Sequence, residues 1–388
     1  MTIIRVAIAI CITAAVSSPV QAQQPAGGTT AAGPAAAQPA VADAAATLRG
    51  KDVLSDQDKA QLRQWITEKI ASLEDAAKKN DAKAMVRIKR DMTDAAASGG
   101  ASPATPTFRI AFAEAGSALF QPYLGIGEDA RGNDARVALY LAQVLAALKQ
   151  PGTLDTLLAA LNSKYPAVRL CAAKAIRDMR GDIVATRANQ LDRIITQIQQ
   201  AGAKEGDAPT ARALYEAVDF RAAAPATTNR VIGAMLEILS GRVQFYDNEL
   251  VSDFYPDAYA LNVLQGVDLP DAEKRRAIPI VVAIVDRAAE RWQSVAREEE
   301  GVAVAAENPY DALSVRDWHL RYQLAYVTEE AEALLKKLAP AGAQTPDVAS
   351  LMRNVSTAEP VRAAADQWRS LLAQGPATAP AGQATATP

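Results

Sequence analysis

The chain contains 388 residues, of which 49% are hydrophobic and 5% are aromatic, and its formal net charge is −3. This length suits either two ordinary domains or one array of repeats. Because the chain carries no net positive charge that could hold a polyanion, its composition argues against nucleic acid as a partner.

Residues 1–22 have the order of parts found in a secretory signal peptide. Arg5 precedes an apolar run from Val6 to Val16, and the small residues Val20 and Ala22 follow it. We expect cleavage after Ala22, which predicts an exported bacterial protein of the periplasm or extracellular space. The alternative is an uncleaved membrane anchor, but the apolar run is shorter than the roughly 20 residues of a spanning helix. After cleavage we expect no integral membrane segment.

Two segments rich in small residues flank the rest of the chain. Residues 23–53 are rich in Ala, Pro and Gly, and residues 375–388 consist mainly of Ala, Pro and Thr. Segments with so few large apolar residues cannot offset the entropy lost on ordering, so we predict a disordered linker and a disordered tail. Between them we expect a helical repeat region over residues 54–266 and a C-terminal helical region over residues 267–374.

The predicted elements are helices throughout. Ser55 can cap a first helix, and Asp56 and Asp58 suit the positive end of its dipole. Apolar residues then recur at helical spacing through three successive segments up to Leu124. Since no stretch has the alternation of a strand, the sequence predicts an all-α fold.

The stretch Asp134–Gly181 contains an internal repeat. Three short helical patterns are separated by two turns, and the third pattern matches the first at a constant offset of 31 residues. Val137 corresponds to Val168, and Leu145 corresponds to Ile176. The other matched positions are Leu141 with Ala172, Ala142 with Ala173, Val144 with Ala175 and Leu148 with Met179.

The second and third patterns of this stretch resemble the HEAT repeat in its bacterial form. A first helix is followed by a polar turn, and a second helix then opens with Val168 and Arg169. The resemblance is clear only over residues 134–181. The residues that carry it through both copies are Val137, Leu141, Leu145, Leu157, Leu161, Pro166, Val168, Arg169, Ala172 and Ile176.

This resemblance implies a HEAT-like α-solenoid of stacked antiparallel helix pairs. One pair cannot bury its own apolar face, so neighbouring pairs must stack on both sides. The resemblance also implies a structural role for Arg169, whose family counterpart bonds turn groups of adjacent repeats. The preceding copy departs from the pattern, because Ala138 stands where the family has arginine.

The C-terminal region differs in having longer helical patterns. One runs from Pro270 to Arg297 and is expected to end at Glu298–Gly301, and the next runs from Asp311 to Leu338. Two long helices around a short loop predict an antiparallel hairpin. It either caps the array or forms a separate bundle.

The chain is poor in residues that carry catalysis. His319 is the only histidine, so a histidine-based site would depend on it alone, and we predict no metal and no cofactor. Cys171 is the only cysteine left after signal cleavage, and we expect it to be a small buried apolar residue. The sequence contains neither a G-x-S-x-G elbow nor a Walker loop. We therefore do not expect an enzyme.

One aromatic cluster lies outside the repeat. Phe245, Tyr246, Phe254, Tyr255 and Tyr259 are close in sequence and have acidic residues nearby. They are a candidate surface for a partner. The alternative is that these rings fill the junction between the array and the C-terminal hairpin.

Together these features favour an exported scaffold for protein–protein interaction, with another envelope protein as its partner, because solenoids recognise partners on extended faces. One alternative is a periplasmic α-helical protein that binds or cleaves glycans through the aromatic cluster. Another is a purely structural envelope protein. All three rest on analogy with the fold class.

Overall fold

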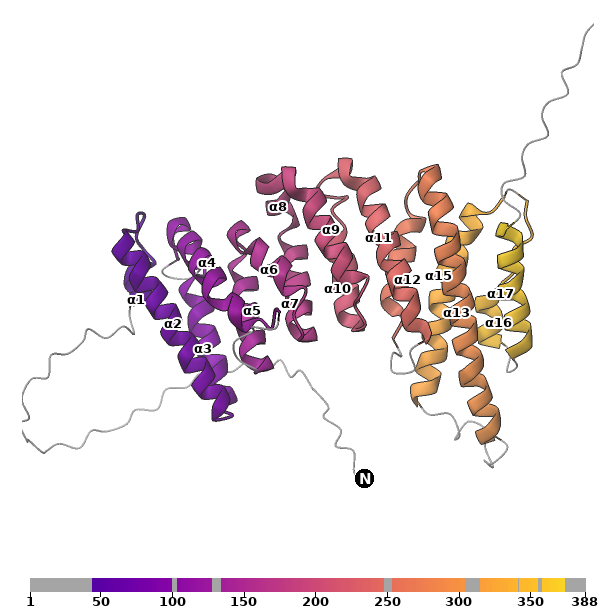
Figure 1. Cartoon of the computed structure of the whole chain (residues 1–388), viewed down its shortest axis with the longest axis horizontal. Helices are drawn as coiled ribbons and strands as arrows, with labels where there is room; N and C mark the ends of the chain where they lie inside the picture. The colour runs from indigo at the N-terminus through magenta and orange to yellow at the C-terminus, as the bar shows by residue number, and fades with distance from the viewer. Residues whose placement is uncertain are drawn as a thin grey trace, which may run out of the picture. The chain divides into compact units, whose positions relative to one another are not determined.

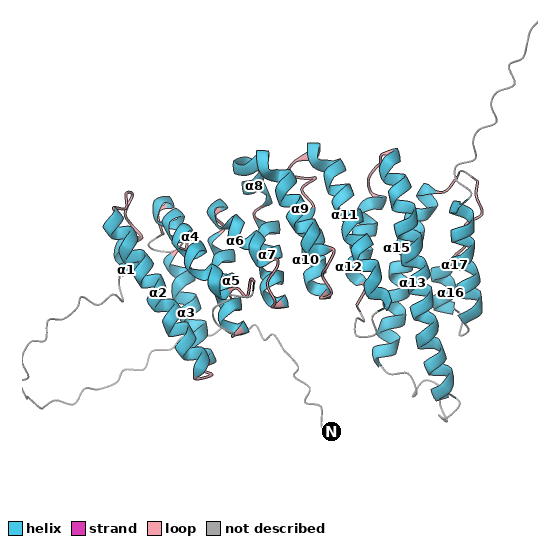
Figure 2. Cartoon of the chain, viewed as in Figure 1, coloured by secondary structure: helices cyan, strands magenta, loops and turns pink. Residues whose placement is uncertain are grey.

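The computed structural model describes residues 44–99, 103–127, 134–247, 253–303, 315–340, 342–354 and 358–373. Within these ranges the secondary structure is helical and contains no strand, which confirms the predicted all-α class (Figure 2). Residues 1–43 and 374–388 lie outside the described ranges. The predictions of a signal peptide, of a linker over 23–43 and of a tail therefore stay predictions.

The helices follow one another in chain order (Figure 1). The first are α1 (Ala44–Leu48), α2 (Asp56–Lys78), α3 (Ala82–Ala95), α4 (Pro106–Phe120), α5 (Ala135–Leu148), α6 (Leu154–Ala160), α7 (Pro166–Asp178), α8 (Arg180–Arg187) and α9 (Leu191–Gly202). Then come α10 (Ala208–Val218), α11 (Thr228–Arg242), α12 (Tyr255–Gln265), α13 (Asp271–Ala303), α15 (Val315–Leu338), α16 (Val348–Asn354) and α17 (Ala358–Ala373). Short 3₁₀ turns are η2 (Gln121–Tyr123), η3 (Pro151–Thr153), η4 (Ala188–Gln190), η5 (Pro225–Thr227) and η6 (Val243–Asp247).

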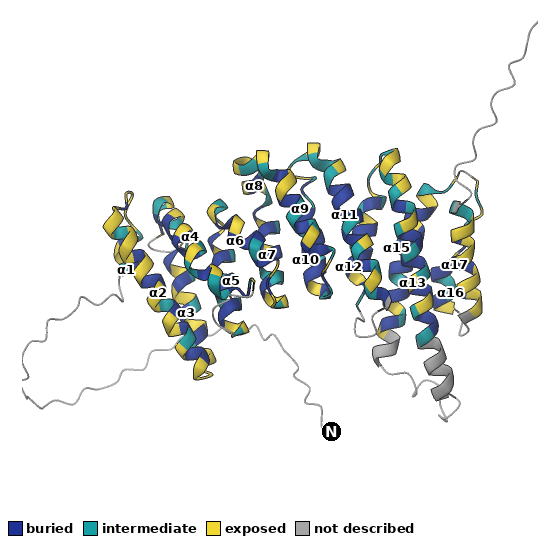
Figure 3. Cartoon of the chain, viewed as in Figure 1, coloured by how far each residue is buried: buried dark blue, intermediate teal, exposed yellow. Residues whose placement is uncertain are grey.

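Most of these helices belong to two rows that pack against each other. In the first row α2 packs on α4, α4 reaches α6 through η3, and α6, α9, α11 and α13 follow in contact. In the second row α3, α5, α7, α10, α12 and α15 each contact the next. Cross-row contacts join α2 to α3, α4 to α5, α6 to α7, α9 to α10, α11 to α12 and α13 to α15. Buried residues lie on the helix faces that meet other helices (Figure 3).

The internal repeat is visible as two equivalent buried faces. α5 and α7 are neighbours in the second row, and every matched position of the 31-residue offset is buried in both helices. Three of the six matched positions in the second copy are alanines, which let the neighbouring helices approach closely. The periodicity therefore identified the faces that pack.

The beginning of the folded unit lies earlier than the sequence predicts. α1 falls within residues 23–53, which were expected to be a disordered linker, yet Leu48 is 1% exposed and Ala45 is 4% exposed. Thr105 holds this segment by donating a backbone bond of 2.9 Å to the Arg49 carbonyl and a hydroxyl bond of 2.8 Å to the Lys51 carbonyl. These tertiary contacts order a segment whose composition alone favours disorder. Ser55 caps α2 as expected, in a capping box with Asp58.

The two long C-terminal helices run antiparallel. The start of α13 at Ile278 lies beside the end of α15 at Leu338, while Trp292 further along α13 lies under Arg321 near the start of α15. α13 continues to Ala303, past the glutamates at which the sequence predicted its end. α13 also contacts α11, and α15 contacts α12, so the hairpin continues both rows.

A buried carboxylate holds the last helices against this hairpin. Glu332 of α15 is 1% exposed and accepts bonds from the backbone N–H groups of Val348 and Ala349 at 2.8 and 3.0 Å, which satisfy the first turn of α16. It also accepts a bond of 2.7 Å from the indole of Trp368 in α17. One side chain thus links three helices.

Candidate functional site

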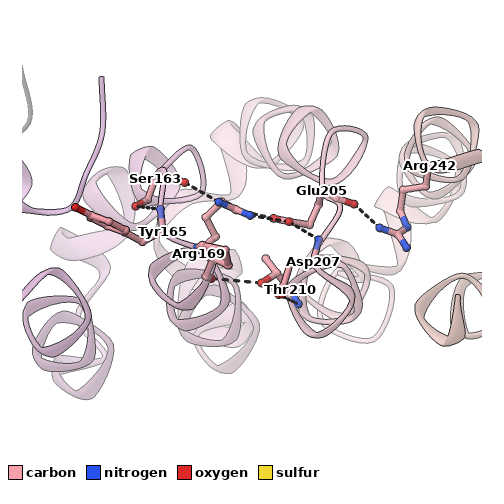
Figure 4. A network of polar contacts seen from close by, with 8 residues as sticks. Ser163, Tyr165, Arg169, Glu205, Asp207, Thr210 and Arg242 are labelled. Atoms are coloured by element: carbon pink, nitrogen blue, oxygen red, sulfur yellow. Dashed lines mark hydrogen bonds and ion pairs between the residues drawn. The ribbon is translucent and has the colours of Figure 1, made fainter. Parts of the chain in front are cut away.

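Arg169 joins the turn before its own helix to the turn of the next helix pair (Figure 4). Its Nη1 donates to the Ser163 carbonyl at 2.9 Å. Its Nε and Nη2 donate to the two carboxylate oxygens of Glu205 at 2.6 and 2.8 Å, a bidentate geometry. Glu205 is 3% exposed and also accepts a bond of 2.9 Å from the backbone N–H of Asp207. Arg169 therefore connects the turn at Ser163 to the turn at Glu205.

The preceding copy has Ala138 in place of this arginine, and the nearby Arg136 makes a different contact. Arg136, two residues before Ala138, donates to the Ala77 carbonyl and to the Asn80 side chain, both at 2.9 Å. Asp134 orients its guanidinium through bonds of 3.0 and 2.6 Å. Arg136 thus reaches back to the turn between α2 and α3, whereas Arg169 reaches forward.

The polar chain continues from Glu205 to α12. Arg242, at the end of α11, donates through Nη1 to the Glu205 carbonyl and through Nε to Asp257 at 2.6 Å. Asp257 also accepts bonds from the hydroxyls of Tyr215 at 2.8 Å and Tyr246 at 3.4 Å. Burial, and then the charge of Asp257, raises the pKa of both tyrosines well above the usual value, so both remain hydrogen-bond donors.

The structure divides the predicted aromatic surface into buried and accessible rings. Tyr246 and Phe254 are 1% and 0% exposed and stack on each other with centroids 4.2 Å apart, so they cannot contact a partner. Phe245 and Tyr259 are half-buried, and Tyr255 is 50% exposed. Tyr246 and Phe254 are therefore interior rings, in line with the alternative that rings of the cluster fill a junction between helices.

A second group of aromatic residues completes the accessible surface. Tyr255 of α12 stacks on Tyr326 of α15 with centroids 5.6 Å apart, and the Arg212 guanidinium of α10 lies 3.7 Å from the centre of the Tyr259 ring. Tyr322, one turn before Tyr326, is 62% exposed. We call Arg212, Tyr255, Tyr259, Tyr322 and Tyr326 the tyrosine surface. Arg212, Tyr322 and Tyr326 are not among the residues predicted from sequence, although the four-residue spacing of Tyr322 and Tyr326 marks one helix face.

Paired charges border the tyrosine surface. Glu216 accepts bonds from Arg212 at 2.8 Å and from Arg177 at 2.7 Å, and Asp219 pairs with Arg221 at 2.8 Å. These are partly buried pairs of opposite charge on and beside α10. The charges on the α10 side of the surface are therefore paired, whereas Glu330 lies beside Tyr326 and accepts a bond from Gln265.

Neither His319 nor Cys171 lies in a cluster of ligating groups. His319 is exposed, and its Nε2 lies 2.6 Å from the Gln323 amide nitrogen. Cys171 is half-buried rather than buried as expected, and burial raises the pKa of its thiol to about 11. Among the described residues, no group of three His, Cys, Asp or Glu side chains could hold a metal ion.

The helices within the described ranges are too short or too polar to cross a membrane. No protein-family model matches the chain, and comparisons with curated proteins and with solved structures gave no significant match.

Proposed function

We propose that this protein is an exported HEAT-like α-solenoid that presents a surface to another protein of the cell envelope. The observation that carries the proposal is the tyrosine surface, in which exposed Tyr255 stacks on Tyr326 and exposed Tyr322 lies one turn away. Tyrosine and arginine are enriched among the residues that dominate the energy of protein interfaces. The surface spans α10, α12 and α15, so a partner would contact successive helices of one row.

Three further features support the proposal. The sequential contacts within each row are those expected of stacked helix pairs, and solenoids bind partners across such rows. The charges beside the rings on α10 are paired, as in the contact between Arg212 and Glu216, so this part of the surface suits a partner that is recognised by ring contact and hydrogen bonds. The signal-like residues 1–22 support an envelope location.

The test begins with recovery of a partner from the envelope fraction and continues with that partner in purified form. We expect Tyr255→Ala combined with Tyr322→Ala to weaken its binding at least tenfold, because each hot-spot truncation costs about 2 kcal/mol or more. Val86→Ala combined with Ile110→Ala is the matched control. These side chains are 47% and 51% exposed but lie on α3 and α4.

Two results would contradict the proposal. If purified binding is unaffected by the tyrosine substitutions, the surface is wrongly assigned. If the protein is recovered alone and instead binds or turns over cell-wall fragments, and the tyrosine substitutions abolish that activity, the glycan alternative replaces the protein partner.

A further inference from the structure

A pocket of about 470 Å³ lies where the start of α13 meets the ends of α15 and α17. This volume falls within the roughly 300–1,000 Å³ typical of small-molecule sites. The pocket is separate from the tyrosine surface, with which it shares no residue. Its lining combines an apolar wall with a charged rim.

The apolar wall retains surface that folding has not removed from water. Ile278, Leu338, Leu371 and Leu372 line the pocket, and all four are only half-buried. By contrast, Leu334 one turn earlier in α15 is fully buried. An alkyl chain placed in the pocket would cover these side chains and remove that surface from water.

The rim carries an excess of positive charge. Lys274 and Arg275 are exposed on the first turns of α13, and Asp271 is the acidic residue of the lining. Asp271 accepts a bond of 3.0 Å from Lys274, and within the described ranges no carboxylate forms an ion pair with Arg275. One carboxylate therefore faces two cations, and the imbalance suits an anionic group.

We propose that this pocket binds a free single-chain amphiphile, with its alkyl chain on Ile278, Leu338 and Leu372 and its anionic head group at Lys274 and Arg275. The class of ligand is a fatty carboxylate or an alkyl phosphate. This proposal does not depend on the tyrosine surface or on a protein partner.

The chain's own C-terminal residues are a poorer occupant. Residues 374–388 begin directly after α17, which contributes Leu371 and Leu372 to the wall. They contain no Asp or Glu, and their apolar side chains are those of Ala and Pro alone. Such residues supply neither the long apolar chain nor the negative charge that the lining favours.

The test measures affinity by calorimetric titration of the full exported chain. The ligands are octanoate, decanoate and dodecanoate, each kept below its micelle concentration. Affinity should increase about fourfold for each methylene that is buried, as expected from the transfer of CH₂ groups out of water. Lys274→Glu combined with Arg275→Glu should weaken dodecanoate binding at least tenfold but change the binding of neutral dodecanol less than twofold. Ala339→Phe, which fills the pocket from the residue that follows α15, should abolish binding of both.

The matched control is Lys59→Glu combined with Arg63→Glu, which makes the same charge change on exposed positions of α2 and should leave dodecanoate binding unchanged. Absence of binding by all three carboxylates would overturn the proposal. Binding that appears only after removal of residues 375–388 would overturn it in favour of the chain's own tail. Binding to anionic vesicles but not to monomeric dodecanoate would overturn it in favour of a membrane surface.

Discussion

Arg242 and Asp257 form an ion pair of 2.6 Å in which each side chain is 1% exposed. The pair joins the end of α11 to the first turn of α12, and the same arginine holds the Glu205 carbonyl in the turn before α10. It is the most deeply buried ion pair among the described residues. Its burial distinguishes it from the ion pairs on the surface, which remain in contact with water.

We expect Asp257→Leu to lower the free energy of unfolding by about 3–5 kcal/mol, because it leaves the buried charge of Arg242 unpaired. Replacing both residues, as Arg242→Met with Asp257→Leu, should cost less than Asp257→Leu alone, since no charge then remains buried. Denaturant unfolding of both variants measures this. As a control, Arg353→Ala removes the exposed ion pair between Arg353 and Glu329. It should lower the free energy of unfolding by no more than about 1 kcal/mol. A cost for Asp257→Leu as small as that of the control would disprove the assignment.

Gly241 lies at a close helix–turn contact. A Cβ at this position would meet the Ala203 backbone oxygen at 2.5 Å and the Ala203 Cβ at 2.7 Å. Gly241→Ala must therefore move backbone atoms, and we expect a loss of about 1–3 kcal/mol in the free energy of unfolding. The control is Gly181→Ala, an exposed position of α8 with no neighbour within 4 Å, where alanine should stabilise by up to about 1 kcal/mol. Equal melting temperatures for the two variants would contradict the contact.

The Cys171 thiol should react slowly in the native protein. Burial raises its pKa from 9.0 to about 11, so its thiolate fraction near pH 8 falls about 100-fold relative to the unfolded chain. In a Cys11→Ser variant Cys171 is the only thiol, and its alkylation by iodoacetamide can be followed by mass. We expect labelling to be at least 100-fold faster in denaturant. Comparable native and denatured rates would show that the thiol is more accessible than its burial indicates.

The pKa of Asp58 should lie near 2, well below its ordinary value of 3.8, because Lys51 and then the Ser55 backbone and hydroxyl donate to its carboxylate. A lowered folded-state pKa means that the stabilising contribution is present above about pH 3.8 and is lost as pH falls through about 2. Carboxyl NMR titration measures this directly. Lys51→Met should raise the pKa, whereas Lys59→Met, which removes a lysine that faces Asp56, should not. An unchanged Asp58 pKa in Lys51→Met would refute the assigned cause.

Helices and their buried faces were predictable from the sequence because helical periodicity is a local property. The matched positions Val137 and Val168, for example, are both buried. α1 could not be predicted in this way, since the residues that follow it are held by Thr105, which donates to the carbonyls of Arg49 and Lys51 from more than fifty positions away. Composition indicates only whether a segment is ordered in isolation, without the contacts that the rest of the chain supplies.

The candidate site was only partly predictable for the same reason. Whether a ring of the cluster is buried depends on its long-range neighbours: Tyr246 lies in η6, which packs on α11 and α13, whereas Tyr255 lies in α12, which packs on α15. Glu205 lies between α9 and α10, and nothing in its local sequence indicates that it is the partner of Arg169. Packing between segments far apart in the chain decides both which rings are exposed and which residue pairs with Arg169.

Tyr255 and Asp257 are two residues apart in α12, and residues at that spacing point to different sides of a helix. On the inner side Asp257 is bonded by Arg242, Tyr215 and Tyr246, and on the outer side Tyr255 is stacked on Tyr326. The first turn of α12 is therefore clamped from both sides before any ligand arrives. A molecule that binds to Tyr255 would restrict few protein groups that are free to move before binding. The entropy lost on association would therefore come mainly from the ligand.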